Sequence, residues 1–285
     1  MHFNYYFLKS LSKSLQENLI GKTLATCFSQ NKDELVLIFE NEDTQFIIKA
    51  TFDNVISFLT FPKDFNRARK NSVDLFDEIK GHSVKKIIQY ENERSISLTF
   101  DNNFKLLLKL HGRRANICLF ENEQFHSMFK NSFVNDRDII LDKVHRTIDQ
   151  SKEACLSSKF NLKTLFPTFD NYCYAYLSEH DFVERNDSDK LKLLEQLLDQ
   201  LNSGHYVILE KEDGHPYLSL LNEPDLNFEF RSPDPIEACN LLASQYFHSY
   251  LLKKEKSQLI FNIDKDIDKG NSYIEKSKHK LQLII

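Results

Sequence analysis

The sequence predicts an α+β protein built on a duplicated unit, a helix followed by an antiparallel β-meander, with a small helical insert and the start of a long coiled-coil helix. Three observations support this prediction. Apolar residues near the beginning of the chain follow helical spacing, short β-branched and aromatic runs then come in two groups, and a seven-residue apolar repeat ends the chain. With 285 residues, 41% of them hydrophobic, the chain is long enough for about two domains.

The first unit is expected to open with a helix over residues 4–20. Its apolar residues recur at intervals of three and four, and Gly21 lies where a helix cap belongs: Tyr5, Leu8, Leu11, Leu15 and Leu19. Four runs rich in β-branched and aromatic residues follow, at 23–29, 34–40, 45–50 and 55–61, separated by polar turn residues. These runs predict a four-stranded antiparallel meander.

The same order then recurs, with a short helical stretch predicted over 72–81 and strands over 83–90, 95–100, 104–110 and 115–120. An offset of about sixty residues places Gly21 on Gly81, Leu35-Leu37-Phe39 on Ile96-Leu98-Phe100, and Ile56 on Ile117. We interpret the two units as a tandem duplication over residues 1–155, whose sheets pack as a sandwich or a closed barrel-like core. The alternative is a chance similarity between two meanders.

Residues 156–204 are predicted to form a small helical insert. Its strongest helix begins at Lys190 and has one leucine face ending before Gly204: Leu191, Leu194, Leu197, Leu198 and Leu201. Residues 205–250 are predicted to form a β-hairpin, turning at Asp213-Gly214, and a connecting helix that follows Pro233 and Pro235.

The last segment, 251–285, follows a seven-residue period. Ile260, Ile267, Ile274 and Leu281 are spaced by seven, with Ile263 and Ile284 at the complementary positions. A long surface helix is the alternative, but few surface helices keep such a strict repeat. We therefore expect the first arm of an antiparallel coiled coil, and we expect it to continue in a longer protein.

Composition narrows the function classes. The five cysteines are scattered without a Cys-x-x-Cys pair, so we expect reduced, mostly buried thiols rather than a disulfide framework or a zinc knuckle. No apolar run approaches a membrane span, and the first residues lack the pattern of a signal peptide, which indicates a cytoplasmic protein without membrane contact. The net charge of −5 excludes a chain that coats nucleic acid over its whole surface, so any RNA contact is local.

Motifs for catalysis are absent from the sequence. The ten histidines show no metal-ligand spacing, and neither a Gly-rich phosphate loop nor a Gly-x-Ser-x-Gly elbow occurs. We therefore expect a protein that is not an enzyme, with no metal, no cofactor and no small-molecule substrate.

The stretch "LKLHGRRANICLF" breaks two strand-like runs with Gly112-Arg113-Arg114. Arg113 and Arg114 cannot both point into a core, because each buried guanidinium needs a carboxylate and full hydrogen bonding. We interpret one arginine as bracing the sheet and the other as facing a phosphate, with Gly112 allowing a close backbone approach. A solvated turn is the alternative. Basic residues also cluster at 67–70 and 85–86.

Several stretches resemble the amino-terminal domain of the NFACT family of ribosome quality-control factors: "FLKSLSKSLQENLIGKTLATCFSQNKDELVLIFEN", "NERSISLTFD" and "LKLHGRRANICLFEN". The stretch "SPDPIEACNLLASQYFHSYLLKKEKSQLIFNIDKDIDK" is similar to the helix that leads into that family's coiled coil. The resemblance implies a fold like the amino-terminal sandwich of formamidopyrimidine DNA glycosylases. It also implies binding to large ribosomal subunits obstructed by peptidyl-tRNA, and recruitment of tRNA for untemplated tailing of the stalled chain.

The resemblance also implies site residues. The family's Asp-Arg pair, a tRNA contact, falls on Glu93-Arg94, which keeps both charges with one more methylene. Its Gly-Arg-His-Ser-Asn pattern falls on Gly112 to Asn116, which makes Gly112, Arg113, Arg114 and Asn116 candidates for RNA or phosphate contact. Its helix-hairpin-helix module corresponds to 160–204, where "FPTFDNY" replaces the expected hairpin, so no nucleic-acid contact is assigned there. For Arg94 the alternative is an ion pair with Glu91 or Glu93.

Two other classes compete with this interpretation. A DNA glycosylase of the related fold needs a proline amine at its start with an adjacent Glu, and Met1-His2-Phe3 stands there instead, which leaves at most a DNA-binding relative without the catalytic terminus. The second competing class is an adhesin, because the family's older name implies fibronectin binding. An exported adhesin should show a signal or an anchor, and the sequence shows neither.

Overall fold

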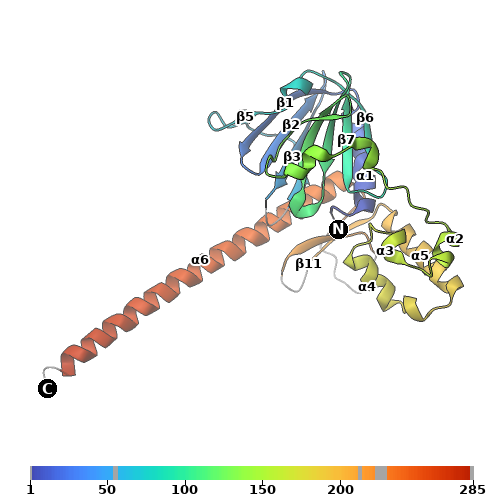
Figure 1. Cartoon of the computed structure of the whole chain (residues 1–285). Coiled ribbons are helices and arrows are strands. Elements are labelled where there is room, and N and C mark those ends of the chain that lie inside the picture. Colours follow the sequence, from blue (N-terminus) through green and yellow to red (C-terminus); the bar gives the residue numbers. More distant parts are fainter. Residues whose placement is uncertain (1, 54–56, 211–213, 222–229, 283–285) are drawn as a thin grey trace.

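The computed structural model describes residues 2–53, 57–210, 214–221 and 230–282. Figure 1 shows two meanders packed together, a cluster of short helices beside them, and one long helix that leaves the body of the protein. The fold is α+β with antiparallel sheets, as the sequence predicts. All five cysteines are buried free thiols. In the described residues, no helix combines the length and apolar character needed to span a bilayer.

The first unit opens with helix α1 (Tyr5–Leu19), whose N-terminus is capped by the Asn4 side chain accepting from the Tyr6 N–H at 2.9 Å. Its five-stranded sheet has the order β4-β3-β2-β1-β5. The strands are β1 (Thr23–Asn31), β2 (Glu34–Glu40), β3 (Gln45–Phe52), β4 (Ser57–Thr60) and β5 (Val73–Asp74).

The second unit forms a five-stranded sheet with the order β10-β9-β8-β7-β6. Its strands are β6 (Val84–Gln89), β7 (Ser95–Phe100), β8 (Phe104–Lys109), β9 (Asn116–Glu121) and β10 (Gln124–Met128). Apolar side chains from both sheets and from α1 form one continuous buried core. The predicted sandwich is therefore observed. Strand β10 was not predicted.

The two units meet through a symmetric set of backbone hydrogen bonds. Gly21 N–H donates to Val84 O at 2.9 Å, and Gly81 N–H donates to Leu24 O at 2.8 Å. These two bonds are equivalent, because the sixty-residue offset places Gly21 on Gly81 and Leu24 on Val84. In each bond the glycine of one unit donates to the corresponding strand residue of the other unit. Both glycines also have a left-handed φ, +83° and +81°. The predicted equivalence of Gly21 and Gly81 is therefore confirmed.

The predicted helical stretch over 72–81 is wrong. Residues Val73–Asp74 form β5, paired with Phe28 and Ser29 of β1, and only a single 3-10 turn follows at Asp77–Ile79. Pairing with the open edge of β1 outweighs a weak local helical pattern. Only the first unit therefore opens with an α-helix.

The strand registers refine the predicted correspondence of the two units. Leu35 pairs with Ala50, which pairs with Leu59, and in the second unit Ile96 pairs with Leu108, which pairs with Ile117. The offset therefore shortens from 61 to 58 along the meander, and Ile117 corresponds to Leu59. Ile56, the predicted counterpart, lies outside the described residues.

The helical insert contains α2 (Lys152–Ser157), α3 (Leu162–Leu165), α4 (Asn171–Glu179) and α5 (Asp187–Leu201), so its first helix starts before the predicted boundary at 156. Helix α5 is the one predicted from Lys190. It begins three residues earlier, at Asp187, because Asn186 caps it by accepting from the Asp189 N–H at 3.0 Å. Leu194, Leu197 and Leu201 are buried on its inner face.

A small sheet and the long helix complete the fold. Strands β11 (Tyr206–Glu210) and β12 (Pro216–Ser219) form the predicted hairpin, whose Asp213 lies outside the described residues, and β13 (Phe230–Ser232) adds an unpredicted third strand. Helix α6 (Pro235–Gln282) runs unbroken through the connecting helix and the heptad segment. Its first turns pack on the body, while Ile260, Ile267 and Ile274 are exposed along the arm. Leu281 lies within α6 and Ile284 lies outside the described residues.

Candidate nucleic-acid interface

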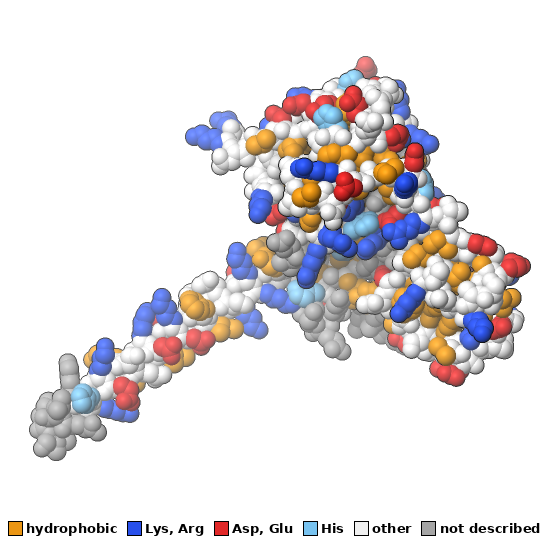
Figure 2. Space-filling view, in the orientation of Figure 1, with side chains coloured by type: hydrophobic (Ala, Val, Ile, Leu, Met, Phe, Trp, Pro, Cys, Tyr) orange, Lys and Arg blue, Asp and Glu red, His pale blue; other side chains and the backbone are white. Residues whose placement is uncertain are grey.

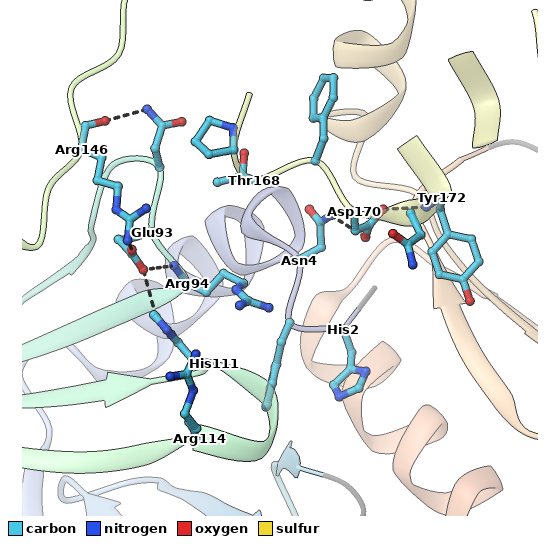
Figure 3. Close-up of a pocket in the computed structure, with 15 residues that line it drawn as sticks. His2, Asn4, Glu93, Arg94, His111, Arg114, Arg146, Thr168, Asp170 and Tyr172 are labelled. Carbon is cyan, nitrogen blue, oxygen red and sulfur yellow. Dashed lines mark hydrogen bonds and ion pairs between the residues drawn. The ribbon is translucent and has the colours of Figure 1, made fainter. Parts of the chain in front are cut away.

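A cavity of about 640 Å³ lies where the second meander, the first residues of the chain and the helical insert meet (Figure 3). The residues that line it come from these three parts and, for Arg146, from the segment that follows the second sheet: His2, Phe3, Asn4, Asn92, Glu93, Arg94, His111, Arg114, Arg146, Pro167, Thr168, Phe169, Asp170, Asn171 and Tyr172. The structure thus brings three predicted site residues, Glu93, Arg94 and Arg114, to one cavity.

The turn that carries Glu93 and Arg94 is held from outside the meander. Tyr90 N–H donates to Ser95 O at 3.0 Å and closes the turn, and Asn92 adopts a left-handed φ of 49° within it. The segment after the second sheet then binds this turn. Arg146 N–H donates to Glu91 O at 3.0 Å, and the Asn92 side chain donates back to Arg146 O at 2.8 Å. Two residues of the turn, Glu91 and Asn92, are thereby bonded to a residue far from them in sequence.

Glu93 lies beneath the cavity and is only 8% exposed. One carboxylate oxygen lies 2.6 Å from Arg146 Nη2, and the other lies 2.9 Å from His111 Nε2 and 3.1 Å from the Arg94 N–H (Figure 3). Burial raises the pKa of the Glu93 carboxyl, but the hydrogen bond and charge of His111, the charge of Arg146 and the Arg94 N–H lower it more. The pKa of Glu93 therefore lies below its usual value, and the carboxylate is charged.

Arg94 and Arg114 are exposed and line the cavity with their side chains. Among the described residues, no carboxylate pairs with either guanidinium, since Glu93 binds Arg146 and His111 instead. The predicted alternative, an ion pair of Arg94 with Glu91 or Glu93, is therefore not formed. Two arginines that keep their full donor sets face the same space.

The opposite wall of the cavity is polar, and the one carboxylate among its described residues, Asp170, is hydrogen-bonded. Asp170 accepts from the Asn4 side chain at 2.8 Å and caps α4 by accepting from the N–H groups of Tyr172 and Cys173 at 3.1 and 3.2 Å. Its charge is therefore held at the start of α4. Tyr172 stacks on Tyr217, with ring centroids 5.0 Å apart, and adds a flat aromatic surface to this wall.

His2 lies at the edge of the cavity and is neutral. Burial is the main cause that lowers its pKa to about 3. Its ring lies 5.1 Å from that of Phe58, and its Nε2 is 2.9 Å from Ser57 O, a distance at which the neutral ring donates a hydrogen bond. This histidine therefore anchors the first residues of the chain on β4 and adds no charge to the cavity.

A smaller hollow of about 290 Å³ adjoins the cavity. Glu93, His111, Arg114 and Arg146 line both hollows, and Lys109 and Lys143 line the smaller one, where Lys109 pairs with Asp136. Figure 2 shows Lys, Arg and His side chains gathered at the junction between the β-sheets and the helical insert. The positive surface thus extends past the cavity although the whole chain is acidic.

The other predicted candidates occupy different places. Gly112 has a left-handed φ of 61° and begins a 3-10 turn, and its carbonyl accepts from the Ser57 hydroxyl at 3.0 Å. Arg113 is exposed but lines neither hollow. Asn116 is fully buried, donates to Asp136 at 2.9 Å and accepts from the Lys130 N–H at 2.8 Å. Asn116 therefore fixes the sheet and does not reach the cavity.

Sequence reasoning missed Arg146, His111 and Asn4 as parts of the cavity. Arg146 lies in a stretch with few strand or helix signals, and only the fold brings it to Glu93. His111 directly precedes the Gly-Arg-Arg turn, so its position next to a predicted site was a usable signal. Asn4 was recognisable as an N-cap before an amphipathic helix, but its bond to Asp170 spans most of the chain.

Comparisons with known proteins identify the fold. No family model matches the sequence, and no curated protein matches it. Among solved structures, the fibrinogen-binding protein from Staphylococcus aureus superposes with a TM-score of 0.60 at 12% identity, over 84% of this chain and 98% of that one. The N-terminal part of the fibronectin/fibrinogen-binding protein from Streptococcus suis gives 0.59 at 18% identity, over 86% and 99%. The chain therefore shares the fold of these two proteins over most of its length.

Proposed function

We propose that this protein binds RNA through the cavity between the second meander and the helical insert. In this proposal it acts in the cytoplasm as a ribosome quality-control factor that engages obstructed large ribosomal subunits and tRNA and supports untemplated tailing. It binds and positions RNA and catalyses no reaction on it. The observation that carries the proposal is the pair of guanidinium groups, Arg94 and Arg114, that line one cavity and have no carboxylate partner among the residues that the structure describes.

The chemistry of the cavity favours a phosphate ligand. A guanidinium binds phosphate oxygens bidentately, and Arg94 and Arg114 keep their donors available for such bonds. The carboxylates in the cavity do not oppose an anion strongly, because Glu93 is paired with Arg146 and bonded to His111, and Asp170 caps α4. Tyr172, whose ring stacks on that of Tyr217, adds an aromatic side chain to the lining.

Glu93 and Arg94, the predicted pair, have different roles in this proposal. Arg94 contacts the RNA, whereas Glu93 holds the turn through its buried bonds to Arg146 and His111. Arg114 is the phosphate contact of the Gly-Arg-Arg turn, and Gly112 shapes that turn with its left-handed φ.

A salt titration of tRNA affinity tests the proposal. Removing one phosphate contact should lower the slope of log affinity against log salt by roughly 1, so Arg94→Ala and Arg114→Ala should each show this decrease. Arg113→Ala is the matched control, because Arg113 is exposed in the same turn as Arg114 but lines neither hollow. All three melting temperatures should stay close to that of the unmodified chain, since exposed arginines contribute little stability. Unchanged affinity and slope for Arg94→Ala and Arg114→Ala would refute the RNA-contact roles.

A second candidate function comes from the names of the similar structures, which describe fibrinogen or fibronectin binding. If this function held instead, the chain would bind immobilised fibronectin or fibrinogen and would fail to retain tRNA or large ribosomal subunits. We expect the reverse. Co-purification of the protein at two salt concentrations, followed by sequencing of the bound RNA, separates the two functions, because ribosomal RNA and tRNA should be recovered and should decrease at the higher salt.

A further inference from the structure

The first meander carries a basic projection that the proposed cavity does not use. The chain leaves β4, extends beyond the edge of the sheet and returns at β5, and we call residues 66–72 of this segment the basic projection (Figure 1). Figure 2 shows Lys and Arg side chains at its far end. It contains Arg67, Arg69 and Lys70, one of the basic clusters that the sequence shows.

The base of the projection is anchored on the outer face of the first sheet. The Phe65 ring lies 5.9 Å from that of Phe28, and the Arg67 guanidinium lies over the Phe28 ring, 4.5 Å from its centroid. Arg67 also donates to Ser72 at 2.6 Å and to Asp74 at 2.7 Å. Arg67 is therefore a structural residue that joins the two ends of the projection.

The tip of the projection presents the two remaining cations to solvent. Arg69 and Lys70 are exposed, and Ala68 N–H donates to the Gln30 side chain at 3.0 Å just before them. Asn71 adopts a left-handed φ of 61° and turns the chain back toward β5. Within the described ranges, neither cation has a carboxylate partner, and the nearby Asp74 is bound to Arg67. Two neighbouring positive charges are thus held outward on an anchored base.

We infer that the basic projection is a second RNA contact, separate from the cavity, which binds the phosphate backbone of a folded RNA. Two adjacent cations on a projecting turn suit phosphates on the surface of a duplex. The residues from Ala68 to Ser72 include no aromatic side chain on which a base could stack, so the contact should be independent of sequence.

An anionic membrane is the other surface that attracts such cations, and the structure favours RNA. Membrane-bound loops add large apolar side chains that enter the lipid boundary. Here the nearby aromatic residues, Phe28 and Phe65, pack inward on the sheet, and residues 68–72 carry only small or polar side chains besides the two cations. The one exposed apolar side chain next to them, Val73, is held in strand β5 at the sheet edge and is too small to enter a lipid boundary as a large aromatic or aliphatic side chain does.

The projection and the cavity belong to different units of the protein. Lining residues of the cavity come from the second meander, the first residues of the chain and the helical insert, whereas the projection extends from the edge of the first sheet beside β1. One RNA molecule, or two, can therefore be contacted at two places. This inference goes beyond the proposed function, because it stands on residues that the cavity does not include.

The experiment compares two double variants of the whole chain. Arg69→Ala/Lys70→Ala removes the tip charges, and Lys85→Ala/Lys86→Ala is the matched control, since it removes an exposed pair of neighbouring cations from the edge strand β6. The probe is a stem-loop RNA with a fully paired stem, titrated at several salt concentrations. We expect the tip variant to bind roughly tenfold more weakly at low salt and to lose about 2 from the salt slope, and the control to change far less. Arg69→Lys/Lys70→Arg should bind as the unmodified chain does.

Several outcomes would overturn the inference. These are equal losses in the two double variants, no loss in the tip variant, or a tip variant that loses binding only to vesicles of phosphatidylserine and phosphatidylcholine. Arg94→Ala is measured in parallel with tRNA. A defect in Arg94→Ala without a defect in the tip variant refutes the projection alone, and the opposite result refutes the cavity alone.

Discussion

The four repeated strands of each meander have the same order, β4-β3-β2-β1 and β9-β8-β7-β6, yet the two meanders differ in the turns that join these strands. In the first meander Asn31 pairs with Glu34, so only Lys32 and Asp33 form the turn between β1 and β2. In the second, Tyr90 pairs with Ser95, and the turn is the four-residue segment 91–94. The longer turn makes room for a buried carboxylate below and an exposed arginine above. The candidate site therefore lies in a turn that only one copy lengthened.

A second difference concerns one position within the strands. Phe58 of β4 and Asn116 of β9 occupy equivalent positions in the two meanders, because each directly precedes one of the equivalent residues Leu59 and Ile117. Phe58 is buried against aromatic rings of His2 and Tyr246, whereas Asn116 is buried in a polar network with Asp136 and Lys130. Identical architecture thus tolerates opposite chemistry, provided each side chain finds its own kind of partner.

The largest expected effect tests the polar copy of this position. Asn116→Ala should lower the free energy of unfolding by about 3 kcal/mol, because it leaves the Lys130 N–H and an oxygen of Asp136 without buried partners. Urea denaturation measures the change. Asn66→Ala, at an exposed position, is the control and should change stability by less than about 0.5 kcal/mol. A loss below about 1 kcal/mol for Asn116→Ala would mean that the network is replaceable by water.

The next effect tests the lengthened turn. Glu93→Gln should lower the free energy of unfolding by about 2 kcal/mol, since it removes the charge that binds Arg146 and His111. This value is below that for a fully buried pair because the Arg146 side chain is 58% exposed. Asp33→Asn is the control in the shorter turn of the first meander. Asp33 pairs with Lys130 at 2.8 Å but is more exposed than Glu93, so its loss should be about 1 kcal/mol or less.

The contribution of Glu93 should also depend on pH in a defined direction. Its pKa is lowered in the folded protein, so the unfolded chain binds the proton more tightly. The stabilisation is therefore present above the ordinary glutamate pKa of 4.5 and is lost as pH falls through that value and through the lower folded pKa. Unfolding curves between pH 7 and pH 3 should show the unmodified chain and Glu93→Gln converging at low pH. A difference that stays constant would contradict the assigned charge.

The repeated strands were predictable because their signals are local. Alternating apolar residues and polar turns mark each run of the meanders, and the sixty-residue offset places the two joining glycines correctly. The helix predicted over residues 72–81 is wrong because a contact distant in sequence decides their structure. Their helical spacing is local, but the free edge of β1 recruits Val73 and Asp74 as a strand, and this pairing is visible only in three dimensions.

The candidate site was predictable only in part. The resemblance located Arg94 and Arg114, both of which line the cavity, but it could not tell that Asn116 lies in the core. The alternation along β9 does not reveal this, since every residue from Asn116 to Phe120 is buried on one face or the other. Arg146 and Asn4 reach the site through contacts spanning 53 and 166 residues, from Glu93 to Arg146 and from Asn4 to Asp170. No spacing rule in the sequence links such positions.

The smallest expected effect tests the symmetry that joins the two meanders. Gly21 and Gly81 both adopt left-handed backbone conformations, and a Cβ atom added at either position would meet no atom within 4 Å. The cost of alanine is then the backbone conformation alone, about 1 kcal/mol at each position. Gly21→Ala and Gly81→Ala should therefore destabilise the protein equally, although one glycine follows a four-turn helix and the other a single 3-10 turn.

The double variant sharpens this test. Gly21 and Gly81 donate to opposite ends of the same short pairing, at Val84 and Leu24, so strain at one glycine should weaken the bonds of the other. The loss in Gly21→Ala/Gly81→Ala should then differ from the sum of the two single losses, as expected for residues that share partners. Equal single losses with such coupling would support a joint that both copies build in the same way. The two single variants could instead lose free energies of unfolding that differ by more than about 0.5 kcal/mol. That result would show that the helix preceding Gly21 makes the two glycine positions energetically unequal.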